Sequence, residues 1–176
     1  MEANAVASIY QGGSGGNGLP DGGLVDNFAG SAIISTSGSA GVVMVVNESG
    51  GVTPSGAALS GTYEAVASGS GRVGLPVMAN NGFGYVTGAT IMNTSGQPMS
   101  GNVQYYNTDG SPQGEPQPFN IGAHASQAVY QGDSSLPNPF YGEAIVTQES
   151  GANNSLIVTT NALSANFFYT YTEPNH

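Results

Sequence analysis

The ten residues GNVQYYNTDG, from Gly101 to Gly110, decide the fold class of this chain. The stretch ends in Asn-Thr-Asp-Gly, and Gly110 fits the left-handed residue that closes a β-hairpin. Before this turn, two sets of side chains alternate with the period 2 of a β-strand, namely Val103, Tyr105 and Asn107 against Asn102, Gln104 and Tyr106. The stretch therefore predicts an antiparallel hairpin.

Similar short runs, rich in Val, Ile, Thr and Tyr, lie on both sides of this hairpin. Turn signals at a spacing of roughly 8–12 residues favour a sandwich or a barrel, and no window shows sustained helical periodicity. Pro112, Pro116 and Pro118 restrict their segment to a loop or an edge strand. We expect an all-β protein, an antiparallel β-sandwich of Ig-like or jelly-roll-like type, with strands at residues 85–93, 101–107, 125–131, 142–148, 155–161 and 166–172.

The charge composition excludes several classes of function. Charged residues are 7% of the 176, against about 25% in a typical domain, and the net charge is −10. There is no Lys, and Arg72 is the one Arg. A chain so poor in cations is unsuited to nucleic acid, to anionic membranes and to phosphorylated substrates. The absence of Cys excludes thiol chemistry and disulfides.

The composition also bears on location. No apolar run is long enough for a transmembrane helix, and Met1-Glu2-Ala3-Asn4 does not begin a signal peptide. Low Lys with high Gly, Ser, Thr and Asn resembles secreted surface proteins. We therefore expect an extracellular or cell-surface location, with the signal peptide outside this chain.

The chain repeats part of itself. Four blocks recur in order: residues 5–12 and 125–132, 28–34 and 140–146, 42–47 and 156–161, and 58–63 and 162–167. Residues 73–122 have no counterpart. We therefore expect a half-module at 1–70 and a complete module at 73–176, built from strands in 73–122 and repeated strands in 123–172. Residues 3–66 and 123–171 should superimpose strand by strand.

The repeated motifs support a family resemblance. They are Leu75-Pro76-Val77-Met78, Tyr105-Tyr106-Asn107, Tyr130-Gln131, Leu136-Pro137 and Gly142-Glu143-Ala144-Ile145-Val146. This pattern resembles the tandem β-sandwich modules of large exported bacterial surface and fibre proteins, with one and a half repeats present here. The resemblance implies a stalk, adhesin or fibre role and brings no catalytic residues.

The spare half-module predicts self-assembly. Its apolar strands need a partner sheet, the chain has no Lys to guard its edge strands, and strand addition between identical chains satisfies open edges. We expect a non-catalytic subunit of a homopolymeric fibre or surface layer, with Val45 buried on both faces of its strand. The assembly and core strands contain Ile33, Ile34, Val42, Val43, Met44, Val45, Val46, Phe167, Tyr169 and Tyr171.

The alternative is a carbohydrate-binding or adhesin module of a larger protein. Tyr105 with Tyr106, or the run from Phe167 to Tyr171, would then form an aromatic platform, although strand alternation favours core packing for these rings. Partners are accordingly other copies of the chain or glycans.

Other candidate sites carry weaker signals. Asp21 and Asp26 are weak candidates for Ca²⁺ ligands, because their spacing matches no EF-hand loop and solvated acids in a surface loop explain them better. No other cofactor is expected. Asn47, Asn93 and Asn153 begin N-glycosylation acceptor sequences, which recur by chance in a chain rich in Asn and Ser. The histidines, His124 and His176, belong to no catalytic arrangement.

Overall fold

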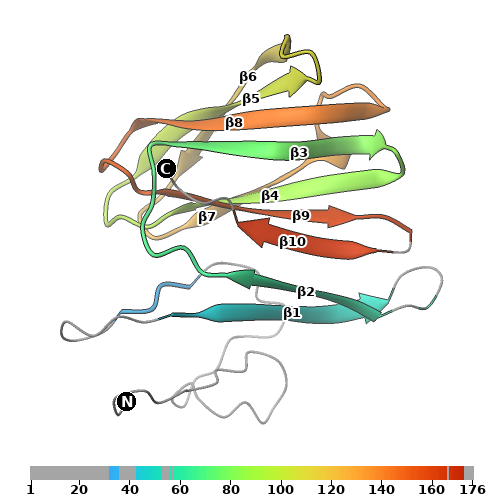
Figure 1. Ribbon diagram of the computed structural model, residues 1–176. Coiled ribbons are helices and arrows are strands. Elements are labelled where there is room, and N and C mark those ends of the chain that lie inside the picture. Colours follow the sequence, from blue (N-terminus) through green and yellow to red (C-terminus); the bar gives the residue numbers. More distant parts are fainter. Residues whose placement is uncertain (1–31, 36–42, 53–55, 57, 166, 173–176) are drawn as a thin grey trace. The chain divides into compact units, whose positions relative to one another are not determined.

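The computed structural model describes residues 32–35, 43–52, 56, 58–165 and 167–172 (Figure 1). Within them the chain forms strands and one 3₁₀ turn, so the predicted all-β class is confirmed. All six expected strands are present, with ends within two residues of the prediction. The elements are β1 (Val45–Val52), β2 (Ala58–Glu64), β3 (Arg72–Gly82), β4 (Tyr85–Asn93), β5 (Met99–Asn107), β6 (Pro112–Ile121), β7 (Ser126–Tyr130), η1 (Gln131–Asp133), β8 (Phe140–Ser150), β9 (Leu156–Leu163) and β10 (Phe168–Thr172).

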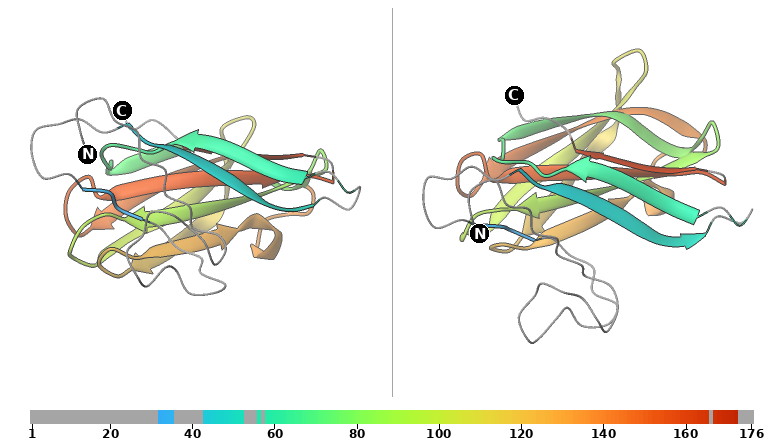
Figure 2. Two further views of the ribbon diagram at one scale, coloured as in Figure 1. Left: turned by 90° about the horizontal axis from the view of Figure 1, so that it is seen from below. Right: turned by 60° about the horizontal axis from the view of Figure 1, so that its bottom comes forward.

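Strands β3 to β10 form an antiparallel β-sandwich. Hydrogen bonds join them in the order β10-β9-β4-β3-β8-β5-β6, and β7 pairs with β4. β3 and β4 pair only at their shared tip, where Asn80 lies opposite Val86 and Gly82 opposite Tyr85. Beyond that tip the strands separate into two layers, β6-β5-β8-β3 and β7-β4-β9-β10 (Figures 1 and 2).

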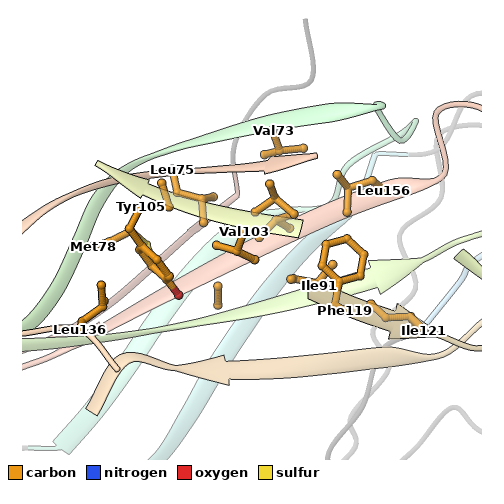
Figure 3. Close-up of a cluster of buried hydrophobic side chains, with 14 of the residues drawn as sticks. Val73, Leu75, Met78, Ile91, Val103, Tyr105, Phe119, Ile121, Leu136 and Leu156 are labelled. Carbon is orange, nitrogen blue, oxygen red and sulfur yellow. The ribbon is translucent and has the colours of Figure 1, made fainter. Parts of the chain in front are cut away.

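The core lies between these layers (Figure 3). Burial alternates along β5 and β9, as the period of 2 predicts, and places Val103 and Tyr105 inside. The buried cluster comprises Val73, Leu75, Met78, Ala89, Ile91, Met99, Val103, Tyr105, Phe119, Ile121, Leu136, Phe140, Ala144, Val146, Leu156 and Val158. Both layers contribute, so the residues 73–172 share one core.

A buried glutamine connects the two layers across this core. Gln131 has no exposed surface, and its Nε2 donates to the Tyr105 hydroxyl of β5 at 3.0 Å. On the other side, Thr87 Oγ1 of β4 donates to Gln131 Oε1 at 3.1 Å and accepts from the Ala79 N–H at 2.9 Å. The Tyr-Gln pair of the sequence motif therefore has a packing role.

The turn and edge predictions are also confirmed. Gly110 has a φ of +82° and its N–H donates to Asn107 O at 2.9 Å, which closes the β5–β6 hairpin. β6 carries the three prolines and is the last strand of the hydrogen-bonded order, so the segment is an edge strand.

The first two strands differ from the sequence expectation. β1 and β2 form a separate two-stranded sheet (Figure 2). Val45 is 55% exposed and Val43 is 89% exposed, so the expected burial of Val45 on both faces is wrong. The run is apolar on both faces, but only one of them meets another strand. Ile33 and Ile34 are also exposed and lie outside any strand, while Val42 lies outside the described residues.

The repeat is only partly testable, because most of residues 3–42 lie outside the described segments. Where both copies are described, one block does not correspond. Residues 58–63 belong to β2, whereas residues 162–167 contain the end of β9 and the turn towards β10. The module boundaries at 70 and 73 stay a prediction.

Candidate functional site

The principal candidate site is the contact between β2 and β10. We call the side chains of Met44, Val46, Glu48, Leu59, Gly61 and Tyr63 the inner face of the hairpin, because the β1–β2 register places them together. Gly61 of this face approaches β10 so closely that an added Cβ would lie 2.6 Å from Thr170 Cγ2 and 3.0 Å from the Phe168 ring. Thr172 Oγ1 donates to Glu64 O at 2.9 Å beside this contact.

The surface that receives the hairpin is the side of β9–β10 turned away from the core. Thr170 lies opposite Asn161 and Phe168 opposite Leu163, so these four side chains share one face. The core side chains of β9, Leu156 and Val158, point the other way. We call Phe168, Thr170, Thr172, Asn161 and Leu163 the acceptor face.

The contact between the inner face and the acceptor face is incompletely satisfied. Asn161 Oδ1 and Thr170 Oγ1 are buried, and neither has a hydrogen-bond partner among the described residues. An unmet buried polar atom costs about 1–3 kcal/mol. An open cleft of about 530 Å³ also lies there, lined by residues 62–68 and 170–172. The hairpin is therefore packed closely at Gly61, whereas the cleft beside it and the two unpaired oxygen atoms leave the rest of the contact incomplete.

The opposite face of the hairpin is uncovered among the described residues, and it carries exposed valines beside the polar side chains of Asn47, Thr62 and Glu64. Val43, Val45 and Val52 are 89%, 55% and 64% exposed, and the register places them on the face away from Gly61. Within the described segments β1 pairs with β2 alone. The hairpin therefore offers exposed valine side chains and a strand edge for pairing.

Burial on the inner face also changes ionisation. Burial raises the pKa of Glu48, a carboxyl on the side that faces the sandwich. Burial first, and then the nearby Glu48 charge, raise the pKa of Tyr63. The chemistry of this contact is accordingly apolar and weakly acidic, and it includes no cation.

A second candidate site is an aromatic cluster at the β3–β4 tip. Phe83 is 83% exposed and has a φ of +51°, a conformation that a bulky side chain rarely adopts. Its ring meets Tyr141 edge-on, with centroids 5.0 Å apart. Nearby, the rings of Tyr85 and Tyr169 meet edge-on with centroids 6.2 Å apart, and burial raises the pKa of Tyr169. The sequence suggested a platform elsewhere.

The structure places the aromatic candidates of the sequence differently from one another. Tyr105 is buried in the core, so a Tyr105–Tyr106 platform is wrong. Phe167 is 63% exposed, and Tyr169 stacks on Tyr171 at 6.3 Å between ring centroids. Phe83 and Tyr141 were missed, because no periodicity marks a turn residue; the NNGFG run of residues 80–84 gives only a turn signal.

Of the glycosylation candidates, Asn93 is contradicted. Its side chain has no exposed surface, its Nδ2 donates to Gln97 O and Gly122 O, and its Oδ1 accepts from Ser95. This amide joins the turn after β4 to the turn after β6, and its burial is incompatible with an attached sugar. Asn47 and Asn153 are exposed and stay candidates.

The remaining candidates give little. Asp21, Asp26 and His176 lie outside the described residues. His124 is a turn residue with a φ of +54°. Among the described residues no three His, Cys, Asp or Glu side chains gather as a metal site would require. That part of the chain also contains no helix long and apolar enough to cross a membrane.

Comparison with family models, with curated proteins and with solved structures finds no match. The functional argument therefore rests on the two sites themselves.

Proposed function

We propose that the protein is a non-catalytic structural subunit of an extracellular homopolymeric fibre or surface layer, assembled by β-strand complementation between copies. One observation carries this proposal: Val43, Val45 and Val52 of the β1–β2 hairpin are exposed, on a face that nothing covers among the described residues. The resemblance to modules of exported surface and fibre proteins agrees with it.

A two-stranded hairpin is marginally stable in water unless other elements cover it. Burying a Val side chain fully stabilises by about 1.5–3 kcal/mol, so covering these three positions is a substantial driving force for association. With one Arg and no Lys, salt bridges between copies can contribute little. Cohesion therefore comes from apolar contact and strand pairing.

Electron microscopy of negatively stained protein tests the proposal with a matched pair of variants. Val45→Asp places a charge on the uncovered face, and Ala128→Asp places the same charge on an exposed position of β7. We expect bundled fibres or sheets from the wild type and from Ala128→Asp, and neither bundles nor sheets from Val45→Asp. Because Val45 is half exposed, its variant should still fold, which circular dichroism and thermal melting will verify. Wild-type protein without any ordered polymer would contradict the proposal.

A second candidate function is carbohydrate binding, which the aromatic cluster favours. Exposed aromatic rings held at a strained turn are suited to stacking on sugar rings, since tyrosine offers a rigid surface with a polar end. Asn81 Nδ2 donates to Asn138 Oδ1 at 3.1 Å, so amides accompany Phe83 near the tip. Pull-down on cellulose, chitin and peptidoglycan, with Phe83→Ala and Tyr141→Ala as variants, tests it. Equal retention of wild type and variants on every polymer would exclude the cluster as a sugar site.

A further inference from the structure

We propose that, in the assembly, the β1–β2 hairpin of one copy docks on the acceptor face of the next copy, replacing that copy's own hairpin. This inference rests on the proposed function and names its connection: the inner face of the hairpin is the donor surface, and β9–β10 is the receptor. The occupant is fixed by the structure, because the hairpin of the same chain already lies on this face.

The chain between the hairpin and the sandwich is suited to this exchange. The sandwich holds the linker firmly at its far end, where Ser70 and Leu156 exchange backbone hydrogen bonds of 2.9 and 3.1 Å and Gly71 O accepts from Gln148 N at 2.9 Å. On the hairpin side, Ala65 N donates to Met44 O at 3.0 Å, so Ala65 still belongs to the hairpin. The hinge is therefore residues 66–69, which extend to about 13 Å at 3.3 Å per residue.

Opening the contact within one chain costs little. No described side chain of the hairpin is fully buried, and the contact leaves Asn161 Oδ1 and Thr170 Oγ1 without partners. The same contacts re-form when a second copy supplies the hairpin, so the exchange changes free energy mainly through the hinge and the entropy of association. Exchange of an identical element is a low-cost route to assembly.

The geometry of exchange predicts open chains. Each copy has one donor surface and one acceptor face, and the two surfaces are different. Such a head-to-tail contact builds a filament unless its rotation closes a ring. The uncovered face with Val43, Val45 and Val52 stays outside this contact and can join neighbouring filaments laterally.

A disulfide tests the direction of docking. Gly61 and Thr170 are suited to it because a Cβ built on Gly61 lies 3.4 Å from Thr170 Cβ, near the 3.5–4.5 Å of natural disulfides. The chain has no Cys, so the double variant Gly61→Cys and Thr170→Cys adds the only two thiols. Replacing Thr170 also removes the Cγ2 atom that would crowd the new side chain.

The assembled double variant is oxidised, collected by sedimentation and run on a denaturing gel without reductant. We expect a ladder of covalent multimers that reduction converts to monomer, while either single variant gives dimers at most. Sedimenting polymer that contains only disulfide-linked monomers would overturn the exchange and leave the proposed assembly intact. Protein that never sediments as a polymer would instead refute the assembly itself, and the exchange with it.

A second variant keeps the test independent of cysteines. Removing Val66 and Ala67 halves the hinge, so a hairpin that exchanges should be forced further towards the neighbouring copy. We expect more polymer and less monomer than in the wild type. A shortened protein that is entirely monomeric, with the hairpin amides still protected from hydrogen exchange, would show docking within one chain and contradict the inference.

Discussion

The buried Gln131 is the strongest single test of how the two layers are held together. We predict that Gln131→Leu, which keeps the volume of the side chain, lowers the free energy of unfolding by about 2–4 kcal/mol. The hydrogen bond of 3.1 Å to Thr87 is lost, which contributes about 0.5–1.5 kcal/mol, together with the bond of 3.0 Å to the Tyr105 hydroxyl. The Tyr105 hydroxyl is then left buried without Gln131, at a cost of about 1–3 kcal/mol.

Chemical denaturation measures this loss, and the melting temperature should fall by roughly 5–15 °C for a chain of this size. The control is the cycle with Tyr105→Phe, which removes the hydroxyl that Gln131 serves. The double variant has no unpaired Tyr105 hydroxyl. The losses of unfolding free energy in the two single variants should therefore sum to about 1–3 kcal/mol more than the loss in the double variant. Strictly additive losses, or a Gln131→Leu variant as stable as the wild type, would refute the connection of the two layers through Gln131.

Three further predictions concern the sites. Burial raises the folded-state pKa of Glu48, so protonation favours the docked hairpin. The stability is fully present below the unfolded pKa of about 4.3 and is lost as the pH rises through the raised pKa. Hairpin amides should therefore be better protected from hydrogen exchange at about pH 4 than at about pH 7. Glu48→Gln should flatten this dependence, and an unchanged profile would contradict the assignment. Asn93→Ala should lower the free energy of unfolding in denaturant by about 2–4 kcal/mol, because the Gln97 and Gly122 carbonyl groups lose their Asn93 donor. A loss below about 1 kcal/mol would count against this role of Asn93. Phe83→Asn should leave the free energy of unfolding unchanged or raise it by up to about 1 kcal/mol, since Asn tolerates a positive φ. A clear destabilisation would mean that Phe83 is needed for folding and is not exposed for binding.

The sandwich was predictable because its signals are local. Alternation placed Val103 and Tyr105 inside, and Gly110 marked a turn that the backbone closes as expected. The prolines of β6 identified an edge strand, because a residue without an N–H cannot serve a central ladder position.

The sites were less predictable because they depend on which elements meet. The run from Val42 to Val46 has apolar residues at successive positions. Such a run fits a strand that is buried on both faces and a hairpin strand that is buried on one face, and sequence alone does not distinguish the two. The sequence Asn93-Thr94-Ser95 matched a glycosylation acceptor, whereas hydrogen bonds to the carbonyl groups of residues 97, 121 and 122 hold the Asn93 side chain inside. Phe83 acquires its exposure from the register of β3 and β4 at their tip, which no local pattern encodes.

The salt dependence of sedimentation tests the central claim most directly. Sedimentation velocity of the wild type at low salt and in about 1 M NaCl should show large polymers in both, unchanged or larger at high salt, because screening relieves the repulsion between copies of net charge −10. Apolar contact and strand pairing do not weaken with salt. A monomer at both concentrations, or a polymer that dissolves in about 1 M NaCl, would contradict assembly through the β1–β2 hairpin.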